Sequence, residues 1–489
     1  MRNHSAIVCA AIAATALASA SVSGAGAAVN GKQGAAALAA PSEAGWGKAI
    51  QVPGSAALSK GSAALVSVSC ASAGNCGAGG VYQNRSGRNE AFVVSERRGI
   101  WHRAVEVPGT AALNKGGNAT VESVSCGSAG NCAAGGFYDT RRSGLQAFVV
   151  SERKGTWHPA VEVPGTAALN KGGEAEVSSV SCASAGNCAA GGYYSDKAGY
   201  EQAFVVGERD GTWGKAVEVP GTAALNTGGQ AQVSSVSCPS AGNCAAGGSY
   251  VVRASEGQLL STEAFVVSER DGTWGKAVEV PGTAALNTGA IAVVYSVSCA
   301  SAGNCAAGGS YRNDGFQAFV VSERDGTWGT AVEVPRSGAL NTGGQAQISS
   351  VSCASAGDCV AGGYYSSAES GGQTLIVTES DGTWGRAGRL PGRAGRSEAE
   401  INSVSCASAG NCAAGGTYFG SGISFQAFLA SEVHGVWGKA AAVPGSAALN
   451  TGGDAAVESV SCASAGRCSA GGVYLISSLH SRAFVVSEP

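Results

Sequence analysis

Sixteen of the 17 cysteines in the chain stand in pairs that share one spacing, Cys-x5-Cys. A cysteine pair can hold a metal, act as a redox couple or form a structural disulfide. No histidine accompanies these pairs, and five intervening residues are not a zinc spacing. The pairs are expected to flank a five-residue turn, and facing residues of a hairpin lie at distances that a disulfide accepts. We therefore predict eight disulfides and no metal or cofactor: Cys70/Cys76, Cys126/Cys132, Cys182/Cys188, Cys238/Cys244, Cys299/Cys305, Cys353/Cys359, Cys406/Cys412 and Cys462/Cys468.

A glutamate recurs once in each repeat. Two neighbouring carboxylates can hydrolyse a glycoside, but eight equivalent ones are expected to accept hydrogen bonds that stabilise a turn. The chain contains no HExxH, GxSxG, phosphate-loop or dinucleotide motif, so the sequence offers little support for an enzyme. The repeated glutamates are Glu96, Glu152, Glu208, Glu269, Glu323, Glu379, Glu432 and Glu488.

A tyrosine follows the second cysteine of every pair by six residues. Rings at this position can pack between neighbouring units, with the hydroxyl bonded to water or backbone. They can also form a ring of platforms for sugars, which makes them candidate ligand-binding residues. Both interpretations are kept for Tyr82, Tyr138, Tyr194, Tyr250, Tyr311, Tyr365, Tyr418 and Tyr474.

One connection between repeats is set apart by its positive charge. It carries Arg389, Arg393 and Arg396, where the other connections are nearly uniform. Such a group could bind an acidic sugar or a phosphate polymer, or it could be a solvated run of charge. These arginines are the second set of candidate ligand-binding residues.

The elements that position these residues are short strands. In the third unit, segments 175–182, 188–194, 202–208 and 212–219 are rich in β-branched and aromatic residues and are separated by small or polar turns. We name them strands A, B, C and D. The turn between C and D contains Asp210-Gly211, which hairpins prefer. No segment shows sustained helical periodicity.

Four antiparallel strands repeated eight times predict an all-β fold, an eight-bladed β-propeller. The propeller sequence begins with a lone strand D, 46–52, and finishes with a lone strand C, 482–488. The N-terminal strand is therefore expected to complete the last blade, which closes the ring and removes two open sheet edges.

The segment Ser268-Glu269-Arg270-Asp271-Gly272-Thr273-Trp274 resembles the Asp-box turn of sialidase-like propellers, which also lies between strands C and D and ends in a tryptophan. The spacing from Ser268 to Trp274 differs from that motif by one residue. The resemblance covers one turn in each blade and implies a propeller like those of secreted bacterial repeat proteins. It does not imply sialidase activity, because the catalytic arginine cluster and Tyr/Glu pair of that family have no counterparts that we could assign.

Residues 1–28 are predicted to be a signal peptide, with a polar start at Arg2 and His4 and an Ala-rich apolar run to about Ala18. Residues 29–45 are predicted to be an Ala/Gly-rich linker, and 46–489 the propeller. Removal of the signal removes Cys9 and leaves an even number of cysteines, as expected of an exported protein. The apolar run is too short for a membrane anchor, and we predict a secreted, extracellular monomer.

The formal net charge is −3, so no basic excess points to nucleic acid. The B–C loops vary among the repeats, and variable repeat loops usually lie on the binding face. We therefore expect a binding or scaffold module for a polysaccharide or a surface protein. Two alternatives stay open. One is a polysaccharide hydrolase or lyase built from non-repeated carboxylates such as Glu174, Asp196 or Glu369; the other is a structural surface protein.

Overall fold

The repeat folds into a four-stranded antiparallel sheet, as predicted. The computed structural model describes residues 45–489 except 254–259, 397 and 421–423, so the predicted signal peptide and nearly all of the predicted linker lie outside the described residues. In the third unit, β12 (Ala175–Ser184) pairs with β13 (Asn187–Ser195), and β13 pairs with β14 (Glu201–Arg209). The A–B turn is therefore two residues long, not five as expected, because Ser184 still pairs with Asn187.

Strand D is not continuous, which corrects the prediction for 212–219. It consists of β15 (Thr212–Trp213) and β16 (Val217–Glu218), and both pair with β14. Between them the N–H of Ala216 donates to Pro164 O of the preceding connection, at 2.7 Å. The middle of strand D is thus bonded to the neighbouring unit. The same bond from an alanine to a preceding proline recurs at all eight junctions.

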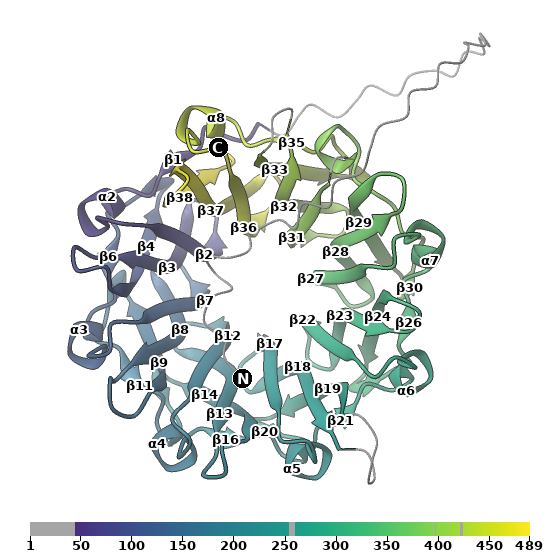
Figure 1. Cartoon of the computed structure of the whole chain (residues 1–489), viewed down its shortest axis with the longest axis horizontal. Helices are drawn as coiled ribbons and strands as arrows, with labels where there is room; N and C mark the ends of the chain where they lie inside the picture. Colours follow the sequence, from purple (N-terminus) through teal and green to yellow (C-terminus); the bar gives the residue numbers. More distant parts are fainter. Residues whose placement is uncertain (1–44, 254–259, 397, 421–423) are drawn as a thin grey trace. The chain divides into compact units, whose positions relative to one another are not determined.

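Eight such sheets surround a central axis in sequence order, so residues 45–489 form an eight-bladed propeller (Figure 1). Strand A is innermost in every blade and strand D is outermost. The A strands are β2 (Ala63–Ser72), β7 (Ala119–Ser128), β12, β17 (Ala231–Ser240), β22 (Ala292–Ser301), β27 (Ala346–Ser355), β31 (Glu400–Ser408) and β36 (Ala455–Ser464). The B strands are β3 (Asn75–Gln83), β8 (Asn131–Asp139), β13, β18 (Asn243–Val252), β23 (Asn304–Arg312), β28 (Asp358–Ser367), β32 (Asn411–Phe419) and β37 (Arg467–Ser477).

The outer strands follow the same order. The C strands are β4 (Asn89–Arg97), β9 (Leu145–Arg153), β14, β19 (Ser261–Arg270), β24 (Phe316–Arg324), β29 (Gly371–Ser380), β33 (Phe425–Val433) and β38 (His480–Ser487). Their central phenylalanines are fully buried, and so is Leu375, which takes their place in the sixth blade. In chain order, the first pieces of strand D are β5 (Ile100–Trp101), β10 (Thr156–Trp157), β15, β20 (Thr273–Trp274), β25 (Thr327–Trp328), β30 (Thr383–Trp384) and β34 (Val436–Trp437). The second pieces are β1 (Ile50–Gln51), β6 (Val105–Glu106), β11 (Val161–Glu162), β16, β21 (Val278–Glu279), β26 (Val332–Glu333) and β35 (Ala441–Ala442).

One-turn helices, which the sequence did not predict, begin the D–A connections. A proline and a glycine precede most of them, and the glycine adopts a left-handed conformation, as at Gly221 with φ 91°. The hydroxyl of Thr222 then donates to Val219 O and fixes the turn. The helices are α2 (Ser55–Leu58), α3 (Thr110–Leu113), α4 (Thr166–Leu169), α5 (Thr222–Leu225), α6 (Thr283–Leu286), α7 (Ser337–Leu340), α8 (Ser446–Leu449) and the 3-10 turn η1 (Ala394–Arg396).

The ring is closed by the N-terminal strand. β1 pairs with β38, and the last sheet has the order β1-β38-β37-β36. Trp46 Nε1 also donates to Ser431 Oγ across the junction, at 3.0 Å. The predicted closure of the last blade by the N-terminal strand is consistent with this sheet.

Serine hydroxyls join the innermost strands around the axis. In the first junction, the N–H of Val124 donates to Ser67 Oγ and the N–H of Cys126 donates to Ser69 Oγ, both at 3.0 Å. Both bonds recur at all eight junctions, including the one from the last blade to the first. The Ser-Val-Ser-Cys motif therefore links each blade to the next.

Candidate functional site

The propeller has two faces with different turns. On one face the A–B and C–D turns touch, as where the N–H of Gly211 donates to Gly186 O at 2.8 Å, and we call this the disulfide face. On the other, the loop face, B–C loops meet D–A connections, as where the N–H of Glu201 donates to Gly229 O at 3.0 Å. The short, uniform turns therefore lie on one face and the variable B–C loops lie on the other.

The cysteine pairs form the eight predicted disulfides, with Cα–Cα distances of 3.9–4.1 Å. Each bridge joins strands A and B of one blade beside their turn. The bridged pairs are Cys70–Cys76, Cys126–Cys132, Cys182–Cys188, Cys238–Cys244, Cys299–Cys305, Cys353–Cys359, Cys406–Cys412 and Cys462–Cys468.

The two cysteines of a bridge differ in burial, which the spacing did not predict. The first is half-buried in every blade but the fourth, whereas the second is only 3–7% exposed. The second cysteine lies in strand B, as predicted for segment 188–194, and its side chain is among the packed residues of the blade. The bridges therefore belong to the core and not to an accessible site. The buried second cysteines are Cys76, Cys132, Cys188, Cys244, Cys305, Cys359, Cys412 and Cys468.

The repeated glutamates are buried acceptors between blades, which corrects their expected role within a turn. Ser95 Oγ in the first blade donates to Glu152 Oε1 in the second at 2.8 Å, and Trp157 Nε1 of the second blade donates to that same Ser95 Oγ at 3.1 Å. This Trp–Ser–Glu link occurs at six of the eight junctions. Gly207 and Thr378 stand in place of the serine at the other two.

The repeated tyrosines lie inside the blades. Seven of the eight are 2–4% exposed, and only Tyr418 is partly exposed. In five blades the hydroxyl donates to a glutamate of strand D, for instance Tyr311 to Glu333 at 2.8 Å. A buried ring offers no face on which a sugar can stack. The geometry therefore fits packing between units and not a platform for sugars.

The arginines of the seventh connection lie at the outer edge of the loop face. Arg389 and Arg393 are exposed, and Arg396 ends η1, with its side chain outside the described part. Burial raises the pKa of Tyr418, and the positive charge of nearby Arg393 opposes that shift. Leu390 and Ala394 bury the inner side of this connection, so only its outer side is open to solvent.

The three non-repeated carboxylates do not form one group. Glu369 lies in the sixth blade, far in the ring from Glu174 and Asp196 of the third. Asp196 accepts hydrogen bonds from the N–H groups of Ala198 and Tyr200 and shapes its own loop. Burial acts against ionisation there, but the hydrogen bonds prevail and hold the pKa of Asp196 below its usual value.

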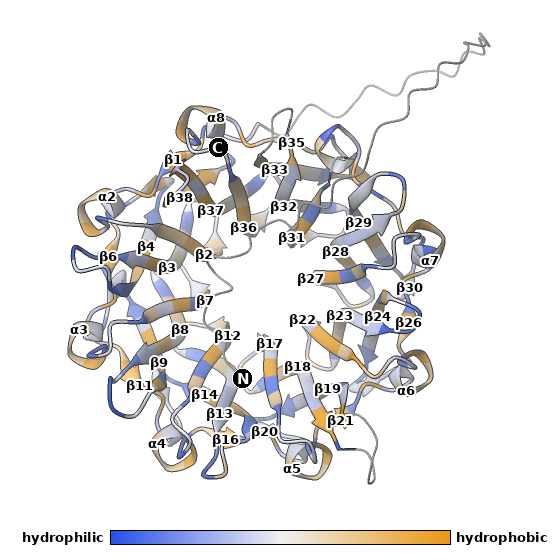
Figure 2. Ribbon diagram, in the orientation of Figure 1, coloured by the Kyte–Doolittle hydropathy of each residue, from blue (hydrophilic) through white to orange (hydrophobic). Residues whose placement is uncertain are grey.

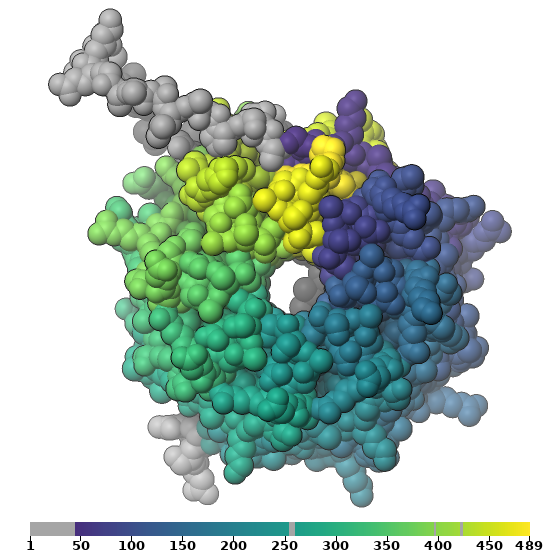
Figure 3. Space-filling view, turned by 180° about the vertical axis from the view of Figure 1, so that it is seen from behind, coloured from purple at the N-terminus to yellow at the C-terminus, as the bar shows by residue number. Residues whose placement is uncertain are grey.

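The break in symmetry that the structure does show lies in the central channel. Figure 3 shows this channel open on the face turned toward the viewer. Along strand A of the third blade, Ala175 and Val177 are buried in the blade, while Glu176 and Ser178 are partly exposed on the channel side. In the first two blades the second residue, Ala64 or Thr120, is buried and only the fourth is partly exposed. The channel wall is therefore set by one or two residues in each blade, and these differ among blades. β22 is mostly hydrophobic, whereas β17 carries hydrophilic residues (Figure 2).

Four glutamates stand on this wall in two groups. Glu122 and Glu176 come from the second and third blades, and Glu400 and Glu458 come from the seventh and eighth. Burial raises the pKa of Glu122 and of Glu176, and mutual repulsion adds to the shift at Glu176. Burial and the charge of Glu400 raise the pKa of Glu458 to about 7. Near neutral pH such groups can both donate and accept hydrogen bonds.

A tyrosine of strand B stands beside Glu176, and a second tyrosine lies on strand A of the fifth blade. The hydroxyl of Tyr193 donates to Glu176 Oε2 at 3.4 Å, and burial raises the pKa of Tyr193. Tyr295 is 37% exposed on the channel side. These residues were not predicted from the sequence, because attention was given to the residues that recur in every repeat. The positions of strand A that vary among repeats were not compared. Comparison of the second and fourth residues of strand A would have found them.

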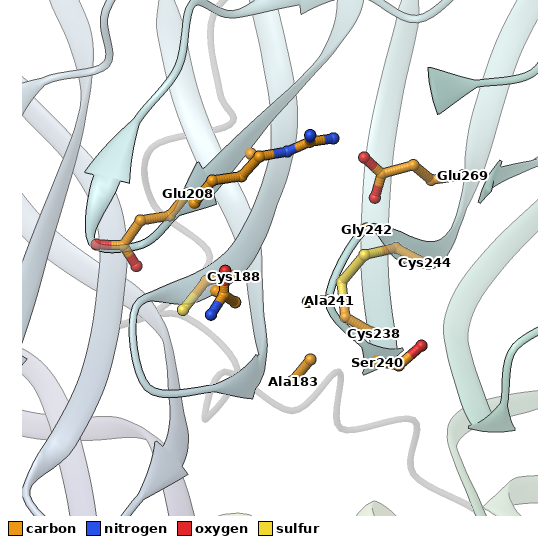
Figure 4. Close-up of a pocket in the computed structure, with 12 residues that line it drawn as sticks. Ala183, Cys188, Glu208, Cys238, Ser240, Ala241, Gly242, Cys244 and Glu269 are labelled. Atoms are coloured by element: carbon orange, nitrogen blue, oxygen red, sulfur yellow. A yellow bond between two sulfur atoms is a disulfide. The ribbon is translucent and has the colours of Figure 1, made fainter. Parts of the chain in front are cut away.

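A small crevice opens on the disulfide face between the third and fourth blades, with room for about one water molecule. Figure 4 shows the disulfide Cys238–Cys244 and the carboxylates of Glu208 and Glu269 around it. The crevice coincides with Gly207, where the serine hydroxyl is missing. A smaller crevice lies at the equivalent place between the fifth and sixth blades, where Ser322 is present, so such gaps do not depend on the missing hydroxyl.

Among the described residues, no group of three or more His, Cys, Asp or Glu side chains is arranged to hold a metal ion. No helix within 45–489, leaving out the gaps named above, is long and apolar enough to cross a membrane.

No protein-family model and no curated protein matches the chain. Solved structures with a related arrangement include sialidases. Hadza microbial sialidase Hz136 has a TM-score of 0.34 at 13% identity, covering 70% of this chain and 68% of that one. The K499G mutant of NanB sialidase from Streptococcus pneumoniae has a TM-score of 0.36 at 11% identity, with 92% and 99% covered. The α-L-arabinofuranosidase Arb93A from Fusarium graminearum has a TM-score of 0.36 at 12% identity, with 65% and 93% covered. At these scores the likeness carries no argument about activity.

Proposed function

We propose that this protein is an extracellular binding module that holds a polysaccharide on its loop face. The eight disulfides fit an oxidising compartment outside the cytoplasm. If the test below finds no bound glycan, two alternatives remain: binding of a surface protein, or a purely structural role at the cell surface.

One observation carries the proposal: near-identical connections recur around a single face. In the third connection, Ala167, Ala168 and Lys171 are exposed, whereas Thr166 and Asn170 are buried and hold the turn. The equivalent residues recur with small changes in the other connections. A polysaccharide presents one chemical unit many times, so a ring of similar weak sites gains affinity through avidity.

The test is an array of plant, fungal and bacterial polysaccharides probed with the oxidised protein. A hydrophilic segment of about ten residues inserted after Ser143 would block the loop face, since loop tips tolerate insertion. The same segment inserted after Lys154 lies on the disulfide face of the same blade and is the matched control. We expect only the first insertion to lower binding. Equal binding by both variants would contradict a loop-face site, and an array without any bound glycan would contradict the proposal.

A second candidate, a glycoside hydrolase, is favoured by one observation. Glu122 and Glu176 are neighbouring channel carboxylates with raised pKa values, and Tyr193 is bonded to one of them. Such an enzyme needs one carboxylic acid and one carboxylate at the scissile bond.

Release of reducing ends from every bound polymer tests this candidate. Loss of product with E176Q, while E400Q in the other group of channel glutamates stays active, would support it. If no bound polymer is cleaved by the unaltered protein, the hydrolase is excluded and the binding module stands.

A further inference from the structure

The longest run of exposed cations on the loop face lies in the first three blades, apart from Arg389 and Arg393 of the seventh connection. We call this run the basic arc. All seven side chains are exposed, and they come from the first three D–A connections and the first three B–C loops: Lys60, Arg85, Lys115, Arg141, Arg142, Lys171 and Lys197. The corresponding segments of the next three blades carry only Arg253, Arg312 and Arg336 as cations.

The members of the basic arc follow one another without a break, because loops and connections alternate around the face. The N–H of Lys60 donates to Gln83 O at the base of the first B–C loop, at 3.0 Å. On the other side of that loop, the N–H of Asn89 donates to Gly117 O in the next connection, at 3.0 Å.

The alternation continues through the second and third blades. The N–H of Gly116 donates to Asp139 O at 2.7 Å, which joins the second connection to the second loop. At the end of that loop a Cβ on Gly144 would collide with Gly173 O, so the loop touches the third connection. The N–H of Gly172 there donates to Ser195 O at 2.9 Å, at the base of the third loop. The arc is thus one continuous surface.

Among the described residues, these cations form no ion pair. The ion pairs found there are Arg97–Glu152, Arg153–Glu208 and Arg324–Glu379, all at C–D turns on the disulfide face. Lys115 and Lys171 bond only backbone oxygens, at 2.9 and 2.7 Å. Their charge is therefore open to a ligand.

The basic arc has few acidic neighbours, and most of their carboxylates already accept hydrogen bonds. Glu90 is buried and accepts hydrogen bonds from two asparagine side chains. Asp139 accepts a backbone N–H of the second loop. Asp196 accepts two backbone N–H groups of the third loop. Glu174 is exposed in the third connection, so a single exposed carboxylate faces several exposed cations.

The lysines of the connections stand where other connections have a threonine with a structural bond. Thr227 Oγ1 accepts the N–H of Arg253 at 2.9 Å, and Thr342 Oγ1 accepts the N–H of Ala368 at 3.0 Å, so threonine holds the next B–C loop. Lysine at this position lacks the hydroxyl that makes the bond. Lysine in place of threonine therefore removes a bond to the next B–C loop, and it adds a positive charge to each of the first three connections.

We propose that the basic arc binds an anionic glycopolymer, one whose repeating units carry carboxylate or phosphate. This rests on the proposed function and names its ligand class. Cations spaced along an arc match charges spaced along a linear chain, and each contact releases a counterion. The formal net charge of −3 argues against a general polycation that takes any polyanion.

The test compares the full-length exported protein with the variant K60T/K115T/K171T, which copies the chain's own threonine connections and should fold as well. Affinity is measured by titration against polygalacturonate, poly(glycerol phosphate), neutral dextran and duplex DNA over a salt series. We expect about tenfold weaker binding of the anionic glycopolymers by the variant and a shallower salt dependence. The variant T227K/T288K/T342K, which extends the cations to further connections, should bind more tightly.

The outcomes separate the two proposals. Binding of carboxylate polymer alone or phosphate polymer alone would identify the anion and support the inference. Equal binding of dextran, with no effect of the lysine changes, would overturn the anionic class but leave a polysaccharide module. DNA bound as tightly as the glycopolymers would overturn it as a general polyanion surface. Binding of no glycan at all would overturn both.

Discussion

Single residues decide how firmly two blades are joined. The Trp–Ser–Glu link gives one carboxylate oxygen of the buried glutamate a hydroxyl donor and gives the indole N–H an acceptor, while Oε2 of Glu152 and of Glu323 has no partner among the described residues. At the sixth junction Thr378 replaces the serine, and Trp437 Nε1 has no partner among the described residues. At the third, Gly207 stands in place of the serine and supplies no hydroxyl between Trp274 and Glu269. Unlinked junctions are expected to be the weakest of the ring.

Gly207→Ser should therefore stabilise the protein. A Cβ at this position meets nothing closer than 4.0 Å, so the hydroxyl can be added without strain. It would stand between Trp274 and Glu269 and contribute about 1 kcal/mol to the free energy of unfolding. Chemical denaturation measures the gain, and Ser151→Gly, which breaks the link at the preceding junction, is the control and should lower stability. An unchanged or lower midpoint for Gly207→Ser would contradict the role given to the link.

Glu458 makes stability depend on pH. Its pKa is raised by burial from 4.5 to about 7 in the folded protein. The contribution of this carboxyl to the free energy of unfolding is therefore fully present below pH 4.5 and is lost as pH rises through 7. Glu458→Gln should raise the free energy of unfolding by about 2 kcal/mol at about pH 8 and leave it unchanged at about pH 4. Thermal unfolding at both pH values measures this, with exposed Glu174→Gln as the control. The same gain at both pH values would show that charge is not the cause.

At the scale of elements, the A–B hairpin is the best-defined unit of each blade. A disulfide crosses its two-residue turn, and in the third blade strand A bonds to the hairpins before and after it through serine hydroxyls. The hairpin is thereby fixed on both sides, although strand B is rich in alanine and glycine. The outer strand D is short and split, so most of the blade's order comes from strands A to C.

Replacement of Cys182 and Cys188 by alanine should lower the free energy of unfolding by about 2 kcal/mol, because the bridge closes only a short loop. The blade should still fold, since its core and its serine links remain. Denaturation of the double variant beside the unaltered protein measures the loss. Complete unfolding of the variant would show that the bridges hold the ring itself.

The elements could be predicted from the sequence where the signal lies within one repeat. Strands A, B and C, the disulfides and the burial of Phe204 follow from alternation and spacing. The split of strand D could not be predicted, because Ala216 bonds to Pro164 in another repeat. The partner of Glu208 was missed for the same reason, since it is Ser151 of the preceding blade.

The candidate site was harder to predict than the fold. The tyrosines recur, and recurrence alone cannot tell a buried ring from an exposed one; the structure buries Tyr194 at 3% exposure. Glu122 and Glu176 occupy different positions of strand A, so no motif connects them. Only the closed ring brings them to one channel wall.

At the scale of the whole molecule, closure of the ring is the feature that protects every sheet edge. β1 covers β38, Val52 is packed between the eighth and first blades, and Ala49 is packed between the seventh and eighth. Deletion of residues 1–53 should therefore lower the melting temperature and cause association through the uncovered β38. Deletion of 1–44, which keeps every residue of β1 and Trp46, is the control and should unfold like the full protein. Scattering and thermal unfolding of both deletions measure this, and equal behaviour would contradict the role of β1.

The closing strand also imposes an order of events on folding. β1 precedes every other strand of the ring in the chain, but its partner β38 is the last. In a chain that folds from its N-terminus, the first strand must remain unpaired until the final one is available, whereas each disulfide joins cysteines only six positions apart and can form at once. Hairpins are therefore expected to oxidise one after another while the circle is still open, and the long-range pairing of β1 with β38 becomes the slow final step.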